Sequence, residues 1–287
     1  MNLKQIKEIF LKELSQIYDK EEIERFFFML LENFHQMKRI DYVLHSTLEI
    51  EKENTEKWNS ALENLKQQKP IQYIINEAEF YGLPFYVNEF TLIPRPETEE
   101  LVDWIIKDEN KRLTNLKNKN ISVLDIGTGS GCIAICLKKN IENAEVYALD
   151  VSDDALKVTQ KNAQLNKVSI HLLNENILTV NTLNNKFDVI VSNPPYVRYL
   201  EKIEIKPNVL NYEPHLALFV SDDDALIFYR KIAQLAIKYL NTNGSLYFEI
   251  NQYLSEEMFK MLKDLGYKNI ELRKDLFGNF RMIKAKL

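Results

Sequence analysis

The first 70 residues carry apolar positions at the spacing of amphipathic helices. Leucine, isoleucine and phenylalanine recur at steps of three and four residues from Leu3 to Ile17, and a second stripe runs from Ile23 to Phe34. Such steps place the apolar side chains on one face of a helix. No glycine interrupts this stretch. The pattern predicts a small helical bundle, and it leaves two roles open for it: a packing element, or a domain that docks a partner.

The pattern changes after the bundle. Residues 71–93 are rich in isoleucine, tyrosine and phenylalanine, which favours a β-hairpin or an extended connector. Pro94 and Pro96 then enforce an extended segment, and Pro96 can open a helix whose apolar face continues to Ile106. Residues 107–120 are polar, and we expect them to form a surface linker.

Short apolar runs alternate with helical patterns in the rest of the chain. The expected strands span residues 121–125, 145–150, 168–173, 187–192, 244–250, 267–272 and 280–286. The expected helices span residues 132–139, 225–240 and 255–265, with a further helix that begins after Ser152. Alternation of this kind predicts an α/β fold with a mostly parallel sheet that helices cover on both faces.

Composition excludes several classes of protein. The formal net charge is -5, which argues against binding to nucleic acid or to membranes through charge. No apolar run approaches the roughly 20 residues that span a bilayer. The 2 cysteines cannot form a disulfide framework, and the 4 histidines show no metal-ligand spacing. We expect a cytoplasmic protein without a metal site.

Glycine is scarce and concentrated at one point. The chain has 7 glycines, and three of them stand in the segment Asp125-Ile126-Gly127-Thr128-Gly129-Ser130-Gly131, where the first expected strand meets a helix. Ligands bind beyond the carboxyl ends of parallel strands. Asp150 ends the next strand, where a carboxylate can accept hydrogen bonds from ribose hydroxyls. We therefore predict a nucleoside-bearing cofactor, with Asp125, Gly127, Thr128, Gly129, Ser130, Gly131 and Asp150 as its binding residues.

The spacing of the glycines narrows the choice of cofactor. A dinucleotide fingerprint needs glycine or alanine three places after its second glycine, where this chain has Cys132. A phosphate-binding Gly-Lys-Ser/Thr loop is absent from the sequence. The form Asp-x-Gly-x-Gly-x-Gly is similar to that of S-adenosylmethionine-dependent methyltransferases. A nicotinamide enzyme and a purely structural turn are the alternatives.

A second motif, Asn193-Pro194-Pro195-Tyr196, follows the fourth expected strand. The prolines make it rigid and unable to extend the sheet. The nitrogen of an amide or aromatic amine is a poor nucleophile, but its NH₂ group is oriented when two acceptors hold it, here the Asn193 side-chain oxygen and the Pro194 carbonyl. Tyr196 can stack on the planar group. We take Asn193, Pro194, Pro195 and Tyr196 as candidate catalytic residues, the alternative being a strand-ending turn.

Taken together, these motifs resemble the PrmC/HemK family of protein-glutamine methyltransferases. The likeness covers residues 70 to 287. The segments that carry it are Glu79–Phe85, Leu92–Glu99, the glycine turn, Asn193–Tyr196, Glu213-Pro214 with Ala217-Leu218, Tyr229-Arg230, and Asp275–Gly278 with Arg281. The first 70 residues match only in position and in being helical.

The resemblance implies a two-domain enzyme that uses S-adenosyl-L-methionine. A helical substrate-docking domain (1–70) and a β-hairpin connector (71–93) would precede a Rossmann-like class I methyltransferase domain with a mostly parallel seven-stranded sheet (94–287). The substrate would be the glutamine of the Gly-Gly-Gln motif in peptide chain release factors, methylated on its side-chain amide nitrogen N(5).

The resemblance also assigns individual residues. Asn193 would touch both the methyl donor and the target amide, with Pro194, Pro195 and Tyr196 lining the glutamine slot. Asn176 and Ile177 would lie beside the adenine, although the family commonly has aspartate where Asn176 stands. We expect a monomer whose partner is a release factor, with no direct contact to nucleic acid or membrane.

Two other functions compete with this one. Asn-Pro-Pro-Tyr also serves enzymes that methylate the exocyclic amine of adenine or guanine, but these usually carry a basic surface and an extra recognition domain. A catalytically inactive adaptor with the same fold is the other alternative. The intact Asn193 and glycine turn argue against the adaptor.

Overall fold

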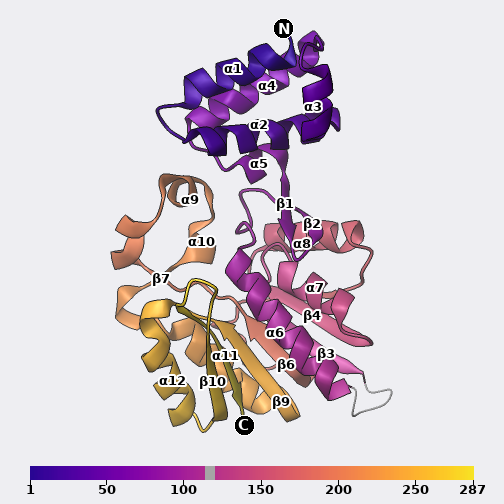
Figure 1. The fold of residues 1–287 in the computed structure, drawn as a ribbon. Coiled ribbons are helices and arrows are strands. Elements are labelled where there is room, and N and C mark those ends of the chain that lie inside the picture. The colour runs from indigo at the N-terminus through magenta and orange to yellow at the C-terminus, as the bar shows by residue number, and fades with distance from the viewer. Residues whose placement is uncertain (114–119) are drawn as a thin grey trace. The chain divides into compact units, whose positions relative to one another are not determined.

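The computed structural model describes residues 1–113 and 120–287 (Figure 1). The chain divides into two compact units. The first contains Met1–Asn76 and Lys206–Tyr212, and the second contains Glu77–Ile205 and Glu213–Leu287. The domain limits expected at residues 70 and 93 stay a prediction.

The first unit is helical, as the apolar spacing predicts. Its helices are α1 (Leu3–Leu14), α2 (Lys20–His35), α3 (Arg39–His45), α4 (Lys52–Lys66), α5 (Ile71–Ile75) and α9 (Pro207–Tyr212). Asn2 and Gln5 cap α1 reciprocally, each side chain accepting from the other's backbone N–H at 2.9 Å. Asp19 caps α2 by accepting from the backbone N–H of Glu22 at 2.8 Å. These caps satisfy N–H groups that a helix start leaves unpaired.

Aromatic rings form the centre of this unit. Trp58 of α4 is buried, stacks on Phe27 with a centroid distance of 5.1 Å, and meets Phe10 edge-on at 5.4 Å. Its Nε1 donates a hydrogen bond to Nε2 of His35 at 3.0 Å. Paired rings of this kind contribute about 0.5–1.5 kcal/mol beyond the burial of their area. The two apolar stripes of the sequence therefore meet in one core.

The second unit begins with the expected hairpin, formed by β1 (Glu77–Phe80) and β2 (Leu83–Tyr86). Tyr81 and Gly82 make its two-residue turn with φ of 51° and 69°, the conformation that such turns require. The prediction of a hairpin or extended connector is wrong for residues 71–75, because these residues form α5. Ile71 packs into the helical core, and this tertiary contact outweighs the local preference of isoleucine for strands.

The prediction of a surface linker over residues 107–120 is also wrong for its first seven residues. Residues 107–113 continue helix α6 (Pro96–Leu113). Lys107 pairs with Asp103, one helical turn earlier, at 2.6 Å, and pairs at this spacing support a helix that faces solvent. Polarity is therefore a poor sign of a loop here. Residues 114–119 of the expected linker lie outside the described residues.

Within the described residues, seven strands form one sheet in the order β10-β11-β9-β6-β3-β4-β5. Their bounds are β3 (Ile121–Ile126), β4 (Ala144–Asp150), β5 (His171–Asn174), β6 (Phe187–Ser192), β9 (Leu240–Glu249), β10 (Lys268–Lys274) and β11 (Phe280–Lys286). β3, β4, β5, β6 and β9 run parallel, and β11 is antiparallel to both of its neighbours. The mostly parallel seven-stranded sheet is confirmed.

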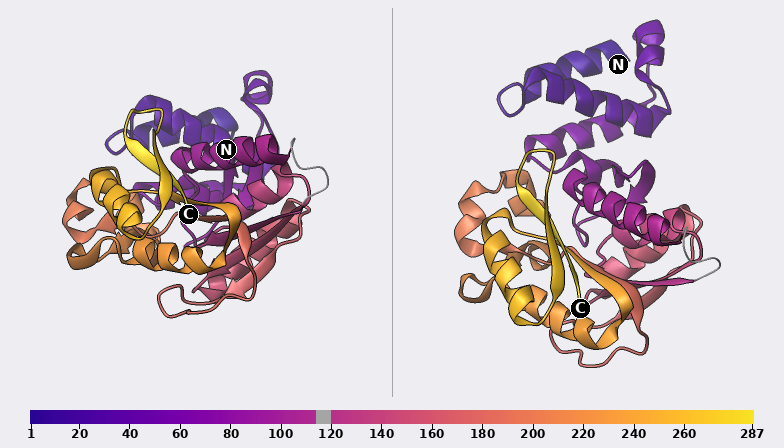
Figure 2. Two further views of the ribbon diagram at one scale, coloured as in Figure 1. Left: turned by 90° about the horizontal axis from the view of Figure 1, so that it is seen from below. Right: turned by 60° about the horizontal axis from the view of Figure 1, so that its bottom comes forward.

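Helices cover both faces of this sheet (Figure 1, Figure 2). The helices of the second unit besides α6 are α7 (Cys132–Asn140), α8 (Asp153–Leu165), α10 (His215–Leu218), α11 (Ile227–Tyr239) and α12 (Ser255–Asp264). Val123 points into the core shared with α6 and α7, while Leu124 points into the core shared with α11 and α12. This alternation explains the continuous apolar character of the central strands.

Short elements complete the second unit. They are the paired strands β7 (Val197–Arg198) and β8 (Phe219–Val220), and the 3₁₀ turns Tyr199–Glu204, Asp222–Asp224 and Gln252–Leu254. Across residues 1–113 and 120–287, none of the helices combines the length and the apolar character needed to cross a bilayer.

Candidate active site

The glycine turn connects β3 to α7 and borders open space. Gly127 and Gly129 have φ of 73° and 56°, in the left-handed region that favours glycine. A Cβ built on either residue meets nothing within 4 Å. A Cβ on Gly131 would lie 2.7 Å from Cγ2 of Thr159, so this third glycine is required by the packing of α7 on α8. The first two glycines are therefore the ones placed to approach a ligand.

Two carboxylates hold the turn in shape. Asp125 is fully buried and accepts a hydrogen bond from Oγ1 of Thr128 at 2.6 Å, and burial raises the pKa of its carboxyl to about 7. Asp150 accepts from the backbone N–H of Gly129 and of Ser152, both at 2.9 Å. Burial also raises the pKa of Asp150. The structure thus brings Asp150 to the turn, as the spacing predicts, and its oxygens keep lone pairs for further donors.

The remaining predicted cofactor residues surround this corner of the sheet. Ser130 is buried, and its carbonyl accepts from Nδ2 of Asn162 at 2.9 Å. Ile177 is buried just after β5, whereas Asn176 is exposed and its Oδ1 accepts from the backbone N–H of Leu178 at 2.9 Å. The Asn176 amide is therefore partly engaged by its own turn.

The Asn-Pro-Pro-Tyr segment begins where β6 ends, beside the glycine turn. Ser192 and Ile126 are partners in the parallel register of β6 and β3. Oγ of Ser192 donates to the carbonyl oxygen of Ile126 at 2.6 Å. Asn193 and Gly127 directly follow this bonded pair, so the two motifs leave the sheet side by side.

Asn193 is half-buried, and its Nδ2 donates to Oγ1 of Thr98 at 3.3 Å. The alternative was a turn in which the Asn193 side chain bonds its own backbone. The structure shows it bonded to Thr98 instead. Pro194 is buried, and Pro195 and Tyr196 are half-buried. The hydroxyl of Tyr196 donates to Oε1 of Glu249 at 3.0 Å.

Two residues of this network escaped sequence reasoning. Thr98 lies in the first turn of α6, and Glu249 ends β9, the strand beside β6. Oγ1 of Thr98 donates to Oε2 of Glu249 at 2.6 Å. Burial raises the pKa of Glu249, while its hydrogen bonds from Thr98 and Tyr196 oppose the rise. An acidic residue at the carboxyl end of a central strand was the available signal, the same signal that singled out Asp150.

Arg95, in the neighbouring Pro-Arg-Pro-Glu segment, forms an ion pair with the buried side chain of Glu213. The same carboxylate accepts from the backbone N–H of Ile93 at 3.1 Å. These contacts fix the extended segment that leads into α6.

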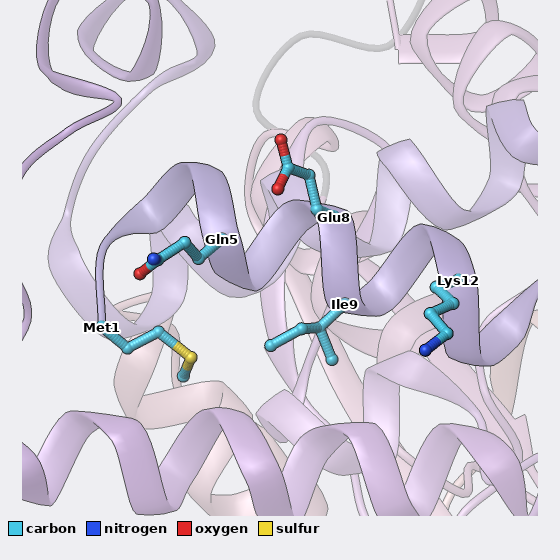
Figure 3. Close-up of a pocket in the computed structure, with 5 residues that line it drawn as sticks. All are labelled: Met1, Gln5, Glu8, Ile9 and Lys12. Atoms are coloured by element: carbon cyan, nitrogen blue, oxygen red, sulfur yellow. The ribbon is translucent and has the colours of Figure 1, made fainter.

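A pocket elsewhere in the chain carries none of the predicted residues. It runs along α1, and the five residues that line it are Met1, Gln5, Glu8, Ile9 and Lys12 (Figure 3). The Gln5 side chain is already engaged in the capping of that helix. Among the described residues, no group of three or more His, Cys, Asp or Glu is placed to bind a metal.

The residues at the glycine turn fit S-adenosyl-L-methionine. Open space borders Gly127 and Gly129, the Asp150 carboxylate is at hand for hydroxyl donors, and Asn193 leaves the sheet next to both. A side chain at either glycine would fill this space, which explains why a chain with few glycines keeps them here.

Two models of known families match this chain. The model of the Methyltransferase small domain matches residues 111–211, and the model of the PrmC N-terminal domain matches residues 10–75.

Relatives match over nearly the whole chain. A release factor glutamine methyltransferase from Flavobacterium psychrophilum is 58% identical over 285 residues, which cover 99% of this chain and 99% of that protein. One from Bacteroides thetaiotaomicron is 39% identical and covers 95% of each chain. Among solved structures, a methyltransferase from Pyrococcus furiosus has a TM-score of 0.51 at 21% identity, covering 79% of this chain and 97% of that one. This last likeness is one of fold.

Proposed function

The chain belongs to the family of release factor glutamine methyltransferases, and we propose that it transfers the methyl group of S-adenosyl-L-methionine to the glutamine of the Gly-Gly-Gln motif in peptide chain release factors. The acceptor is the side-chain amide nitrogen N(5). The observation that carries the proposal is the bond between Ser192 and Ile126, because it sets Asn193 beside the glycine turn. The methyl donor and the target amide then meet at one place.

The cofactor binds at the carboxyl ends of β3, β4 and β5. Gly127 and Gly129 allow close approach of the main chain, and Asp150 accepts hydrogen bonds from ribose hydroxyls. Asp125, Thr128, Ser130 and Gly131 keep the turn in shape, and Asn176 and Ile177 would hold the adenine. When bound, S-adenosyl-L-methionine would supply an electrophilic methyl group, whose bond to the sulfonium sulfur would break as the bond to nitrogen forms and leave a neutral thioether.

The Asn193 side chain orients the target amide. Its Oδ1 and the carbonyl of Pro194 would accept hydrogen bonds from the two N–H groups of the glutamine NH₂, which would turn the nitrogen lone pair toward the methyl donor. Orientation of this kind supplies roughly 7–11 kcal/mol of barrier reduction in favourable cases. Pro195 and Tyr196 line the slot and exclude water. Once alkylated, the nitrogen is acidic and releases its proton to water.

The helical domain of residues 1–70 docks the release factor. This is supported by the match of its residues to the PrmC N-terminal domain and by α3, which has no buried residue. Ile40, Val43 and Leu44 of α3 are 62%, 67% and 68% exposed, which makes an apolar surface available to a partner. A Val43→Lys, Leu44→Lys double variant should raise KM for the release factor and leave kcat unchanged. An unchanged KM would remove docking from this helix.

A cytoplasmic location, a monomeric state and the absence of direct nucleic-acid binding belong to the same proposal. Release factors act on ribosomes, and the net charge of -5 disfavours binding to a phosphate backbone. Light scattering during gel filtration measures the oligomeric state directly.

One experiment decides between the protein substrate and a nucleic acid. The full chain is incubated with isotopically labelled methyl donor and either a release factor or a mixture of RNA and DNA. Mass spectrometry of the Gly-Gly-Gln peptide should show one added methyl on glutamine, and the Asn193→Ala variant should not produce it. Label in adenine or guanine with none in the peptide would favour a nucleic-acid amino-methyltransferase instead.

A further inference from the structure

Glu249 is the buried end of a chain of hydrogen bonds that leads to Asn193. Its side chain is 1% exposed, and it accepts from Thr98 at 2.6 Å and from Tyr196 at 3.0 Å. Thr98 is 3% exposed and in turn accepts from Nδ2 of Asn193 at 3.3 Å. These hydrogen bonds join Asn193 to Thr98, 95 positions apart in sequence, and Thr98 to Glu249, 151 positions apart.

The direction of each hydrogen bond in this chain is fixed by chemistry. A carboxylate only accepts hydrogen bonds, so with Glu249 ionised, the form that its hydrogen bonds from Thr98 and Tyr196 favour, the single hydroxyl proton of Thr98 points at Glu249. The Thr98 oxygen is then left with lone pairs alone on the side of Asn193. It can pair only with the NH₂ end of the Asn193 amide, and the Oδ1 end must face the opposite way.

The orientation of this amide decides what the target glutamine meets. With Oδ1 toward the glutamine slot, Asn193 accepts from the target NH₂ group. After a half-turn of the amide, two NH₂ groups would face each other and neither could accept. We propose that Glu249 is a positioning residue, which through Thr98 fixes the Asn193 amide with Oδ1 toward the target and through Tyr196 holds the wall of the same slot. This inference rests on the proposed function and adds a positioning residue to it.

Substitutions at Thr98 test this role. Thr98→Val keeps the shape and removes the hydroxyl, and it should lower kcat about 10- to 100-fold. Thr98→Ser keeps the hydroxyl and should recover most of that loss. Glu249→Gln can donate to Thr98, which frees the hydroxyl proton to turn, and it should lower kcat to a similar extent. In each variant the dissociation constant for S-adenosyl-L-methionine should stay within about threefold of the parent value.

A matched control separates this effect from loss of stability. Tyr267→Phe removes another buried hydroxyl, which donates to the carbonyl of Ala233 at 2.7 Å outside the network. It should lower the melting temperature about as much as Thr98→Val and leave kcat unchanged. A kcat within threefold of the parent in Thr98→Val, or an equal loss in Thr98→Ser, would overturn the proposal.

A second measurement does not depend on the substrate. The Asn193 side-chain NH₂ gives a pair of signals in an amide ¹H–¹⁵N spectrum, identified by its disappearance in Asn193→Asp. In the parent protein the proton bonded to Thr98 should exchange slowly with solvent, and this protection should be lost in Thr98→Val and kept in Thr98→Ser. Equal protection in the parent and Thr98→Val contradicts the inference, even if nucleic acid proves to be the substrate.

Discussion

Ser192 and Ile126 are joined by a hydrogen bond of 2.6 Å from the Ser192 hydroxyl to the Ile126 carbonyl, and they directly precede Asn193 and Gly127, one residue from each functional motif. Both residues are buried at the ends of neighbouring parallel strands. The bond therefore sets the separation between the glycine turn and Asn193. Because the reacting groups must be held to within fractions of an ångström, loss of this bond should affect turnover as well as stability.

Ser192→Ala should lower the free energy of unfolding by about 1–3 kcal/mol, the usual result of leaving a buried partner unsatisfied. It should also lower kcat on the order of tenfold. The control is Ser122→Ala, at the opposite end of the same two strands, which removes the contacts of the Ser122 hydroxyl with the Lys186 carbonyl and with the carboxylate and backbone N–H of Asp188. If both variants lose equal stability and equal activity, the Ser192 bond has no special role in the site.

Asn193→Ala should separate binding from chemistry. The alanine retains the rigid prolines but removes the amide that orients the target nitrogen, so most turnover should disappear. Binding of S-adenosyl-L-methionine, measured by calorimetry, should stay largely intact because the glycine turn and Asp150 are untouched. Full activity in this variant would refute the role given to the side chain.

Gly129→Val should abolish binding of the cofactor. The added side chain would enter the open space beside the turn, and it would stand at a φ of 56° that valine avoids. Gly82→Val is the matched control: its φ is 69° and its Cβ also meets nothing within 4 Å, but it lies in the β1–β2 turn. Both variants should lose stability, and only Gly129→Val should lose affinity in calorimetry.

Local patterns in the sequence were enough to predict most of the fold. The strands around the glycine turn are short apolar runs closed by polar residues, and both of these features are local. The errors arose where distant contacts decide. Ile71 to Ile75 read as extended but form a helix against the first core, and Lys107 to Leu113 read as a linker but extend a helix supported by charge pairs.

The site was predicted only in part for the same reason. Asp150 stands at a recognisable distance from the glycine turn and Asn193 opens a motif of its own, so the sequence points to both. Thr98 lies at the start of a helix and Glu249 at the end of a distant strand, and no spacing relates the two. Their hydrogen bond exists only because the fold packs α6 against β9, where Trp104 meets Tyr247 edge-on.

Asp125 makes the stability of the fold depend on pH. Burial raises the pKa of its carboxyl from 3.8 to about 7, so the folded state holds a proton that the unfolded chain has released at the same pH. The contribution of Asp125 to the free energy of unfolding is fully present below pH 4 and is lost as the pH rises to 7. This loss corresponds to up to about 4 kcal/mol.

Asp125→Asn should flatten this dependence. The amide keeps an oxygen to accept from Thr128 but does not titrate, so the fall in free energy of unfolding between pH 4 and pH 7 should be smaller than in the parent. Urea unfolding across this range measures the difference. Asp264→Asn makes the same chemical substitution at an exposed position and serves as the control. Parallel curves for the parent and Asp125→Asn would mean that Asp125 is ionised throughout and that its burial is offset by its hydrogen bonds.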